Sequence, residues 1–176
     1  DHIKDIVAMQ QSYARVAGVV EPVSLAGLAE DALQMNAAAL VRHSVHVVRN
    51  YSDVPLVAVD KHKVLQILVN LVRNAKYAME EHAQEHKELE ILLRPEGEDR
   101  VRIAVKDNGT GISAENLVKI FSHGFTTKAD GHGFGLHSSA IVARELGGSL
   151  WAESDGLGAG ATFTLELPVA AKVNAS

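Results

Sequence analysis

Two amide side chains one helical turn apart are the first residues of this sequence whose types and spacing fit a chemical role. Asn70 and Asn74 are separated by four positions, so on a helix both amides lie on the same face. Amide oxygens are neutral, hard ligands that suit Mg²⁺, an ion that usually keeps several waters and takes further ligands from phosphate groups. Two amides that only hydrogen-bond a neighbouring loop would have the same spacing. The pair therefore predicts a Mg²⁺ site only if the chain also carries a phosphate-binding element.

A carboxylate at the end of a predicted strand is the second candidate. Residues 101–107 alternate apolar and polar side chains, which is typical of a half-buried strand, and the turn residues Asn108 and Gly109 follow. Asp107 can accept a hydrogen bond from the exocyclic amine of a nucleobase, while Gly109 and Gly111 lack a Cβ and allow a flat ring to approach the backbone. This combination fits adenine, but an ordinary Asp-Asn-Gly turn contains the same residues.

Alternating glycines provide a candidate phosphate-binding loop. Gly131, Gly133 and Gly135 lead into residues 136–146, whose apolar periodicity predicts a helix. Backbone amides and a helix N-terminus can bind phosphate oxygens. The loop is not a Walker A motif, because no Gly-Lys-Ser/Thr follows, and no strand leads directly into it as a dinucleotide-binding fold requires. Taken alone, the three glycines also fit a simple turn.

The longest helical pattern, over residues 60–83, has to position the two asparagines. Its apolar residues form one stripe, and the asparagines lie on the adjoining polar face. We expect the strands over 45–51 and 56–59 to form one edge of a sheet. The other predicted elements are a helix over 25–35 capped by Ser24, a hairpin of strands 89–93 and 101–105, a short helix after Ser113, and strands over 149–153 and 161–167.

The composition limits the classes of function. The 176 residues are 47% hydrophobic, which suits one globular domain with a sizeable core. The absence of cysteine excludes disulfides and thiolate metal sites. Seventeen basic against 22 acidic residues give a net charge of -5, which does not favour a nucleic-acid partner. No apolar run reaches the length of a membrane span. We expect a cytoplasmic domain, whose full-length protein can itself be membrane-anchored.

Five motifs in a fixed order carry a resemblance to a known family. They are N-x-x-x-N-A at 70–75, D-x-G-x-G at 107–111, F-T-T-K at 125–128, G-x-G-x-G-L at 131–136 and G-A-x-F-x-L-x-L-P at 160–168. In this order they resemble the catalytic ATP-binding domain of sensor histidine kinases, in the Bergerat-fold superfamily that also holds the gyrase, Hsp90 and MutL ATPases. The resemblance implies an α/β two-layer sandwich, in which a mixed β-sheet has helices on one face and ATP lies between the helices and a lid.

The resemblance also implies which residues hold ATP and Mg²⁺. The metal ligands are expected to be Asn74 and Asn70. The expected nucleotide-binding residues are Asn70, Asn74, Tyr77, Asp107, Gly109, Gly111, Ile112, Thr126, Thr127, Lys128, Gly131, Gly133, Phe134, Gly135, Leu136 and Thr162. Thr162 is equally an ordinary β-branched strand residue.

Two positions distinguish this sequence within the superfamily. Relatives that hydrolyse ATP carry a water-activating glutamate where this chain has Asn70, and an amide cannot act as a general base near neutral pH. This predicts phosphoryl transfer to another group rather than rapid hydrolysis. Histidine kinases commonly carry a phosphate-binding lysine where this chain has Tyr77. Arg73, Lys76 and Lys128 remain as candidate replacements.

The resemblance predicts the domain organisation and the partners. Residues 1–20 are expected to be the C-terminal part of a dimerisation and phosphotransfer helix, residues 21–170 the catalytic ATP-binding domain, and residues 171–176 a tail. The expected partners are ATP, the protein's own dimerisation hairpin with the phosphoacceptor histidine, and the receiver domain of a response regulator, within a homodimeric full-length protein. The alternatives are a Bergerat-fold ATPase or chaperone and a nucleotide-sensing module without catalysis.

Overall fold

The computed structural model describes residues 19–82, 84–122 and 135–170. The helix predicted before residue 19 and the tail after residue 170 lie outside these ranges, so both stay predictions. In chain order the described elements are β1 (Glu21–Val23), α2 (Leu25–Met35), α3 (Ala37–Arg42), β2 (Val45–Tyr51), β3 (Val57–Val59), α4 (Lys61–Glu81), β4 (Lys87–Glu96), β5 (Arg100–Asp107), α5 (Ala114–Lys119), α6 (Gly135–Glu145), β6 (Ser149–Glu153) and β7 (Ala161–Pro168).

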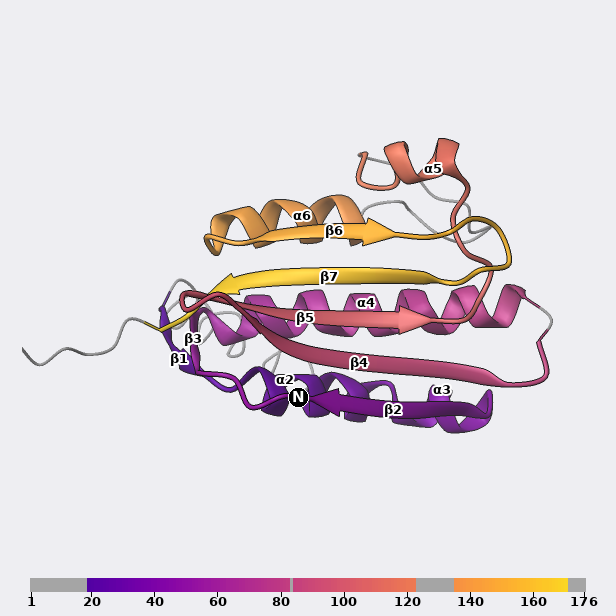
Figure 1. Ribbon diagram of the computed structural model, residues 1–176. Coiled ribbons are helices and arrows are strands. Elements are labelled where there is room, and N and C mark those ends of the chain that lie inside the picture. Colours follow the sequence, from indigo (N-terminus) through magenta and orange to yellow (C-terminus); the bar gives the residue numbers. More distant parts are fainter. Residues whose placement is uncertain (1–18, 83, 123–134, 171–176) are drawn as a thin grey trace, which may run out of the picture.

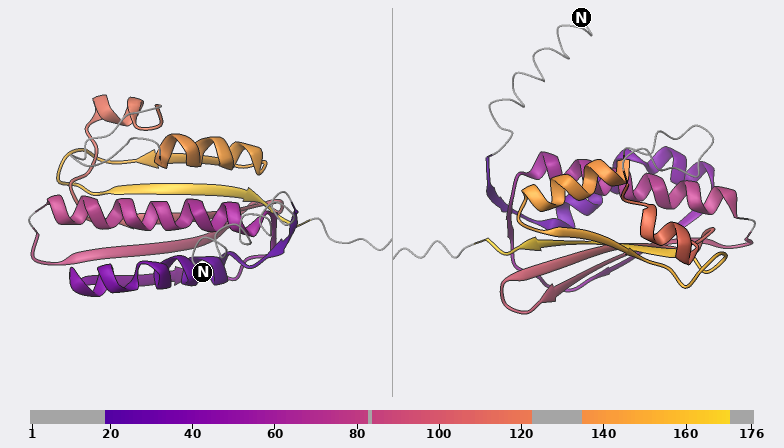
Figure 2. Two further views of the ribbon diagram at one scale, coloured as in Figure 1. Left: turned by 180° about the vertical axis from the view of Figure 1, so that it is seen from behind. Right: turned by 90° about the horizontal axis from the view of Figure 1, so that it is seen from above.

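A five-stranded mixed sheet forms one layer of the molecule. Its strand order is β2-β4-β5-β7-β6, with β2 parallel to β4 and every other neighbouring pair antiparallel. The helices α2, α4 and α6 lie side by side on one face of this sheet, which Figure 2 shows from above, and the other face carries no helix of the described chain (Figure 1). The predicted two-layer α/β sandwich with helices on one face is confirmed.

The helix α4 lies at the centre of the helical layer, between α2 and α6 (Figure 1). The side chain of Asp60 caps its first turn by accepting hydrogen bonds from the backbone N–H groups of His62 and Lys63, at 3.0 and 3.4 Å. The apolar stripe of α4 is buried, and it packs on the sheet and on α2. One face of α4 is therefore held in the core, which sets the direction of the adjoining polar face.

One predicted sheet edge is wrong. The strand expected over 56–59 is β3, and it pairs with β1 in a separate two-stranded ribbon, in antiparallel register from Glu21 with Val59 to Val23 with Val57. No strand was predicted over residues 21–23, where β1 lies. Both strands have only three residues, and nothing in so short a pattern specifies a partner strand. This edge of the main sheet is formed by β2 alone, which has the predicted bounds, and β6 forms the opposite edge.

None of the helices in the described ranges combines the length and the apolar character that crossing a membrane requires.

Candidate functional site

Three segments far apart in the sequence meet beside the polar face of α4. The helix α4 contacts both β5, which ends at Asp107, and α6, which begins at Gly135. A Cβ built on Gly135 would lie 2.7 Å from the Asn70 side-chain oxygen, so the backbone of α6 begins directly against that amide. The strand end, the helix start and the first asparagine, each predicted separately, are brought together by the fold.

Asp107 is a buried carboxylate at the end of β5. Its side chain is on the face of the sheet that the helices cover, and the residue is 3% exposed. Burial raises its pKa to about 6, although hydrogen bonds from the backbone N–H groups of Gly109 and Ala161 oppose this rise. The N–H of Gly109 is 2.8 Å from its Oδ1. Among the described residues no lysine, arginine or histidine forms a salt bridge with Asp107. The carboxylate retains acceptor capacity for a ligand.

The loop after Asp107 is held between α4 and the segment before β7. The N–H of Thr110 donates to the Ala78 carbonyl at 3.0 Å, and the N–H of Gly158 donates to the Thr110 carbonyl at 2.7 Å. A Cβ on Gly109 would lie 2.4 Å from the backbone carbon of Ala78.

Gly111 is equally crowded, since its φ is +71° and a Cβ there would lie 2.1 Å from the Gly156 carbonyl oxygen. The two glycines thus allow backbone segments of the protein to pack together. The sequence had predicted instead that they give room to a ligand ring.

Two polar residues outside the predicted set of binding residues fix the ends of this loop. Ser154 accepts a hydrogen bond from the Ile112 N–H at 2.9 Å and donates to the Gly160 carbonyl at 2.7 Å. Asn108 donates to the His86 carbonyl at 2.7 Å and accepts from the Glu88 N–H at 3.0 Å. The only local signal for either role is the turn propensity of serine and asparagine.

The two asparagines of α4 lie in different surroundings. Asn70 is buried; its Nδ2 donates to the hydroxyl of Ser139 on α6 at 3.3 Å, and its Oδ1 accepts from the Arg73 guanidinium at 2.9 Å. Asn74, one turn further, is half-buried. Tyr77 follows on the same side, 37% exposed, with the Lys76 ammonium 4.4 Å from the centre of its ring. Of the two amides, Asn70 already has its oxygen engaged by a cation, and Asn74 is the more accessible.

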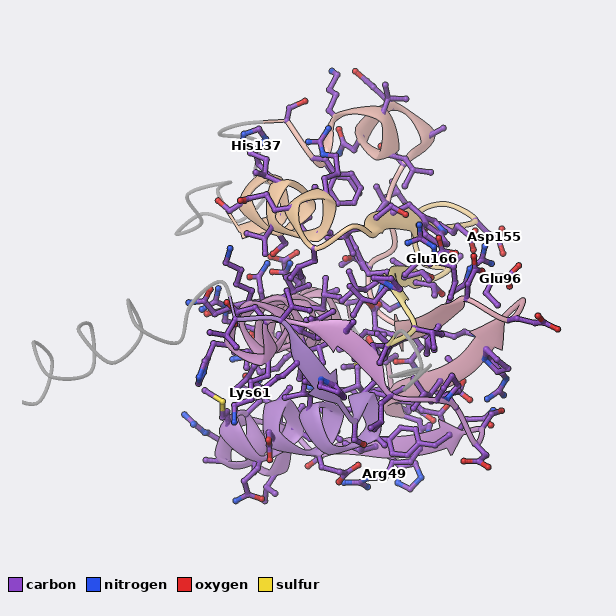
Figure 3. All side chains as sticks on the ribbon, turned by 90° about the vertical axis from the view of Figure 1, so that its left-hand side faces the viewer. Arg49, Lys61, Glu96, His137, Asp155 and Glu166 are labelled. Carbon is purple, nitrogen blue, oxygen red and sulfur yellow. The ribbon has the colours of Figure 1, made fainter. Side chains whose placement is uncertain are left out.

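Thr162 is a correction to the predicted site. It pairs with Lys106 and Glu153, one position out of register with Asp107, so its side chain is on the sheet face without helices. Figure 3 shows that Glu166, on the same face of β7, projects on the side of the sheet away from the helices. Ala161 is the residue that pairs with Asp107, and it is buried beside it. The alternation of Thr162, Thr164 and Glu166 with buried apolar residues was a signal in the sequence for this orientation.

The remaining predicted residues divide into two groups. Ile112 and Leu136 are half-buried and pack against the core. Phe121, which was not among the predicted residues, packs edge-on against Phe163, with ring centres 6.4 Å apart, and its carbonyl is 2.9 Å from Nδ1 of His137 on α6. The other predicted residues lie outside the described ranges: Thr126, Thr127, Lys128, Gly131, Gly133 and Phe134.

The donor groups of the site fit Mg²⁺ bound together with a phosphate ligand. In the part of the chain that the structure describes, no group of three or more histidine, aspartate or glutamate side chains could hold a metal ion by itself. A single amide oxygen, such as that of Asn74, suits an ion that completes its shell from phosphate oxygens and water.

Comparison with known proteins points to one family. Residues 59–171 match the family model described as histidine kinase-, DNA gyrase B- and HSP90-like ATPase. The chain is 35% identical over 171 residues to the sensor protein FixL of Bradyrhizobium diazoefficiens, covering 96% of this chain and 32% of FixL. It is 32% identical over 167 residues to the sensor histidine kinase ZraS of Escherichia coli, covering 88% of this chain and 34% of ZraS. The chain thus spans about a third of the length of these relatives.

The fold is also similar to that of solved domains. The catalytic domain of the histidine kinase ThkA, in a nucleotide-free form, superimposes with a TM-score of 0.72 at 26% identity, and the match covers 85% of this chain and 97% of that domain. Full-length ShkA in complex with AMPPNP has a TM-score of 0.75 at 24% identity, covering 97% of this chain and 37% of ShkA.

Proposed function

Because this chain belongs to the histidine kinase-, DNA gyrase B- and HSP90-like ATPase family, we propose that it binds Mg²⁺-ATP and transfers the γ-phosphate to a histidine on a dimerisation hairpin. It has the ATP-binding catalytic domain of sensor histidine kinases. The observation that carries the proposal is that Asp107 is buried without a salt bridge to any described residue, while an amide, Asn70, stands at the position where hydrolysing relatives carry a glutamate.

In this proposal the base and the phosphates are bound by different elements. Asp107 accepts a hydrogen bond from the adenine amine, in a loop that Ser154 and the α4 backbone hold in place. The phosphates lie toward the first turn of α6 and the polar face of α4, where Asn74 holds Mg²⁺. When bound with ATP, Mg²⁺ neutralises charge on the β- and γ-phosphate oxygens. The protein's part is to position the nucleotide for in-line attack.

The nucleophile of the proposed reaction is an imidazole nitrogen from outside this domain. It forms an N–P bond while the bond from the γ-phosphorus to the bridging oxygen breaks, ADP leaves, and the imidazole proton passes to solvent. Asn70 is an amide whose oxygen accepts from Arg73, so it cannot deprotonate a water molecule. Slow hydrolysis follows from this residue, which leaves the bound ATP available for transfer.

Incubation with labelled ATP tests the proposal. We expect no appreciable labelling of the chain itself, but labelling of a separately supplied dimerisation hairpin that contains the upstream histidine. A hairpin with that histidine changed to alanine is the control and should stay unlabelled. Phosphate release at ordinary ATPase rates without transfer to the hairpin would favour an ATPase instead. Nucleotide binding with neither activity would favour a sensing module.

Removal of the Asn74 amide is expected to abolish the Mg²⁺ dependence of ATP binding. In Asn74→Ala a methyl group replaces the only ligand that the protein provides in this proposal. Calorimetric ATP titrations with and without Mg²⁺ should differ for the wild type and coincide for the variant. Asn116→Ala, on the short helix α5, is a control that should keep the wild-type difference. A Mg²⁺ effect that survives in Asn74→Ala would assign the amide a structural role.

The wider organisation follows from the proposed reaction. We infer that residues 1–20 end the second helix of the dimerisation hairpin, that residues 21–170 are the catalytic domain and that residues 171–176 are a tail. The proposed partners are that hairpin, in a homodimeric full-length protein, and the receiver domain of a response regulator. A cytoplasmic location is proposed because the substrate is ATP.

A further inference from the structure

Tyr77 stands where the resemblance led us to expect a phosphate-binding lysine, so the cation for the phosphates has to come from another position. Arg73 and Lys76 are the two candidates on α4 within the described residues, and the structure gives them different surroundings. Lys128 lies outside the described ranges.

Lys76 is already bound to neighbouring side chains of α4. Its side chain is only 14% exposed, and its ammonium lies 3.9 Å from the carboxylate of Glu80 and 4.4 Å from the centre of the Tyr77 ring. Glu80 also binds Nε2 of His43 on the α3 side, at 2.8 Å. Turning Lys76 toward the phosphates would separate this half-buried ion pair and expose the ring. The positive charge of Lys76 is already compensated by the carboxylate of Glu80.

Arg73 differs from Lys76 both in its exposure and in the kind of group that it binds. It is exposed, and its Nη2 donates to the Oδ1 of Asn70 at 2.9 Å. That acceptor is a neutral amide, and no carboxylate of the described chain forms a salt bridge with Arg73. The same Oδ1 is within 2.7 Å of a Cβ built on Gly135. A full positive charge is therefore held where α6 begins, with no counter-charge from the described residues.

Ser139 holds the Asn70 amide from α6, while Arg73, which can only donate, fixes which end of the amide faces it. The Ser139 hydroxyl accepts from Nδ2 of Asn70 at 3.3 Å, and both residues are buried, at 7% exposure each. With the nitrogen directed to Ser139 on α6, the oxygen is directed to Arg73. A buried two-residue contact between α4 and α6 thus orients an exposed guanidinium.

We propose that Arg73 binds the β- and γ-phosphates of ATP in place of the missing lysine, and that Asn70 and Ser139 are its positioning residues. This inference rests on the proposed function, since it assumes that the phosphates lie between α4 and α6. A planar guanidinium can bind two phosphate oxygens at once, which an ammonium cannot do in the same fixed geometry.

Binding of ATP and AMP to the complete chain tests the proposal, because both contain adenine and only ATP has the β- and γ-phosphates. Arg73→Ala should weaken ATP binding roughly 10- to 100-fold, as expected for lost charge-assisted hydrogen bonds, and leave AMP binding within about twofold of the wild type. Arg73→Gln, which keeps a donor for Asn70 but no charge, should behave like Arg73→Ala. Arg73→Lys should recover part of the loss. Lys76→Ala is the matched control and should keep the wild-type ratio of the two affinities.

The role of Ser139 is tested with a double-mutant cycle. Ser139→Ala should lower the ratio of ATP to AMP affinity in the wild-type background and leave it unchanged in Arg73→Ala, because the serine acts through the guanidinium. A purely structural role would instead weaken both nucleotides in both backgrounds. Thermal unfolding of each variant verifies that it is folded.

The outcomes separate this inference from the proposed function. An unchanged ATP to AMP ratio in Arg73→Ala, or a larger loss in Lys76→Ala or Lys128→Ala, would overturn the role of Arg73 and leave the hairpin-labelling result untouched. A wild-type chain that prefers ATP over AMP through Arg73 but does not label the hairpin would overturn the kinase reaction alone.

Discussion

The Asp107→Asn variant is expected to bind ATP, ADP and adenosine roughly 10- to 100-fold more weakly than the wild type. The substitution keeps the size of the side chain but replaces a buried charged acceptor with an amide, whose nitrogen repels the adenine amine. Isothermal calorimetry with adenosine isolates this effect from the phosphate contacts. Equal adenosine affinity in the two proteins would remove Asp107 from the base site.

The same variant should be more stable than the wild type in the absence of nucleotide. Burial raises the pKa of Asp107 to about 6 from an ordinary value of 3.8, so the folded state binds the proton more tightly than the unfolded state. Its contribution to stability therefore falls as the pH rises from about 4 to 6, and above pH 6 the buried charge costs on the order of 1 to 3 kcal/mol. Asparagine is neutral throughout and avoids this cost. Urea denaturation at pH 7 should show the gain in stability.

Adenosine binding by the wild type should depend on pH in the range where the Asp107 carboxyl titrates. As the pH falls through about 6, the wild-type carboxyl becomes protonated and loses its charged acceptor, so its affinity should decrease toward that of Asp107→Asn. The variant itself should show no such dependence. Parallel pH profiles for the two proteins would mean that another group controls binding.

The Gly109→Ala variant is expected to lose about 2 to 4 kcal/mol of folding stability. The new methyl group would lie 2.4 Å from the Ala78 carbon, 2.5 Å from its oxygen and 2.7 Å from the Met79 nitrogen, all of them backbone atoms in the last turn of α4. The loop has to withdraw, which breaks the hydrogen bond from Thr110 to Ala78. Nucleotide binding should weaken as well, because the loop positions Asp107.

Gly27→Ala is the matched control for this effect. Gly27 lies in the first turn of α2, and a Cβ there would be in ordinary contact with Ser24, at 3.6 Å. Alanine is the better helix former, so this variant should gain up to about 1 kcal/mol. Chemical denaturation of both variants measures the difference. A Gly109→Ala protein as stable as the wild type would mean that the loop does not pack on α4 as described.

The elements of this fold could be predicted from the sequence wherever the pattern was local. The 21 residues of α4 have a regular apolar stripe that begins at a capping Asp60, and β2 has the predicted bounds. Ser24 and Ser113 cap α2 and α5 as expected, each accepting from the N–H three residues on. Periodicity and capping act within one or two turns, so one sequence contains all the information they need.

Which elements meet, and what each residue contacts, was decided by the tertiary structure. The pattern of β3 predicted a strand, but its partner β1 became evident only in the folded chain. The sequence predicted that the absence of a Cβ matters at Gly109, yet the groups that exclude a Cβ there are backbone atoms of Ala78 and Met79 in α4 rather than a ligand.

The residues of the site divide in the same way, between properties that the sequence determined and contacts that the fold decided. The sequence by itself determined that an aspartate, two asparagines and alternate glycines occur in the order of a nucleotide-binding family. Only the fold decided that the oxygen of Asn70 faces Arg73, that Lys76 is bound to Glu80, and that Thr162 lies on the opposite face from Asp107. The physical reason is that residue type and spacing set what a side chain can do, whereas its partners are set by contacts between segments distant in the chain, which a local pattern does not encode.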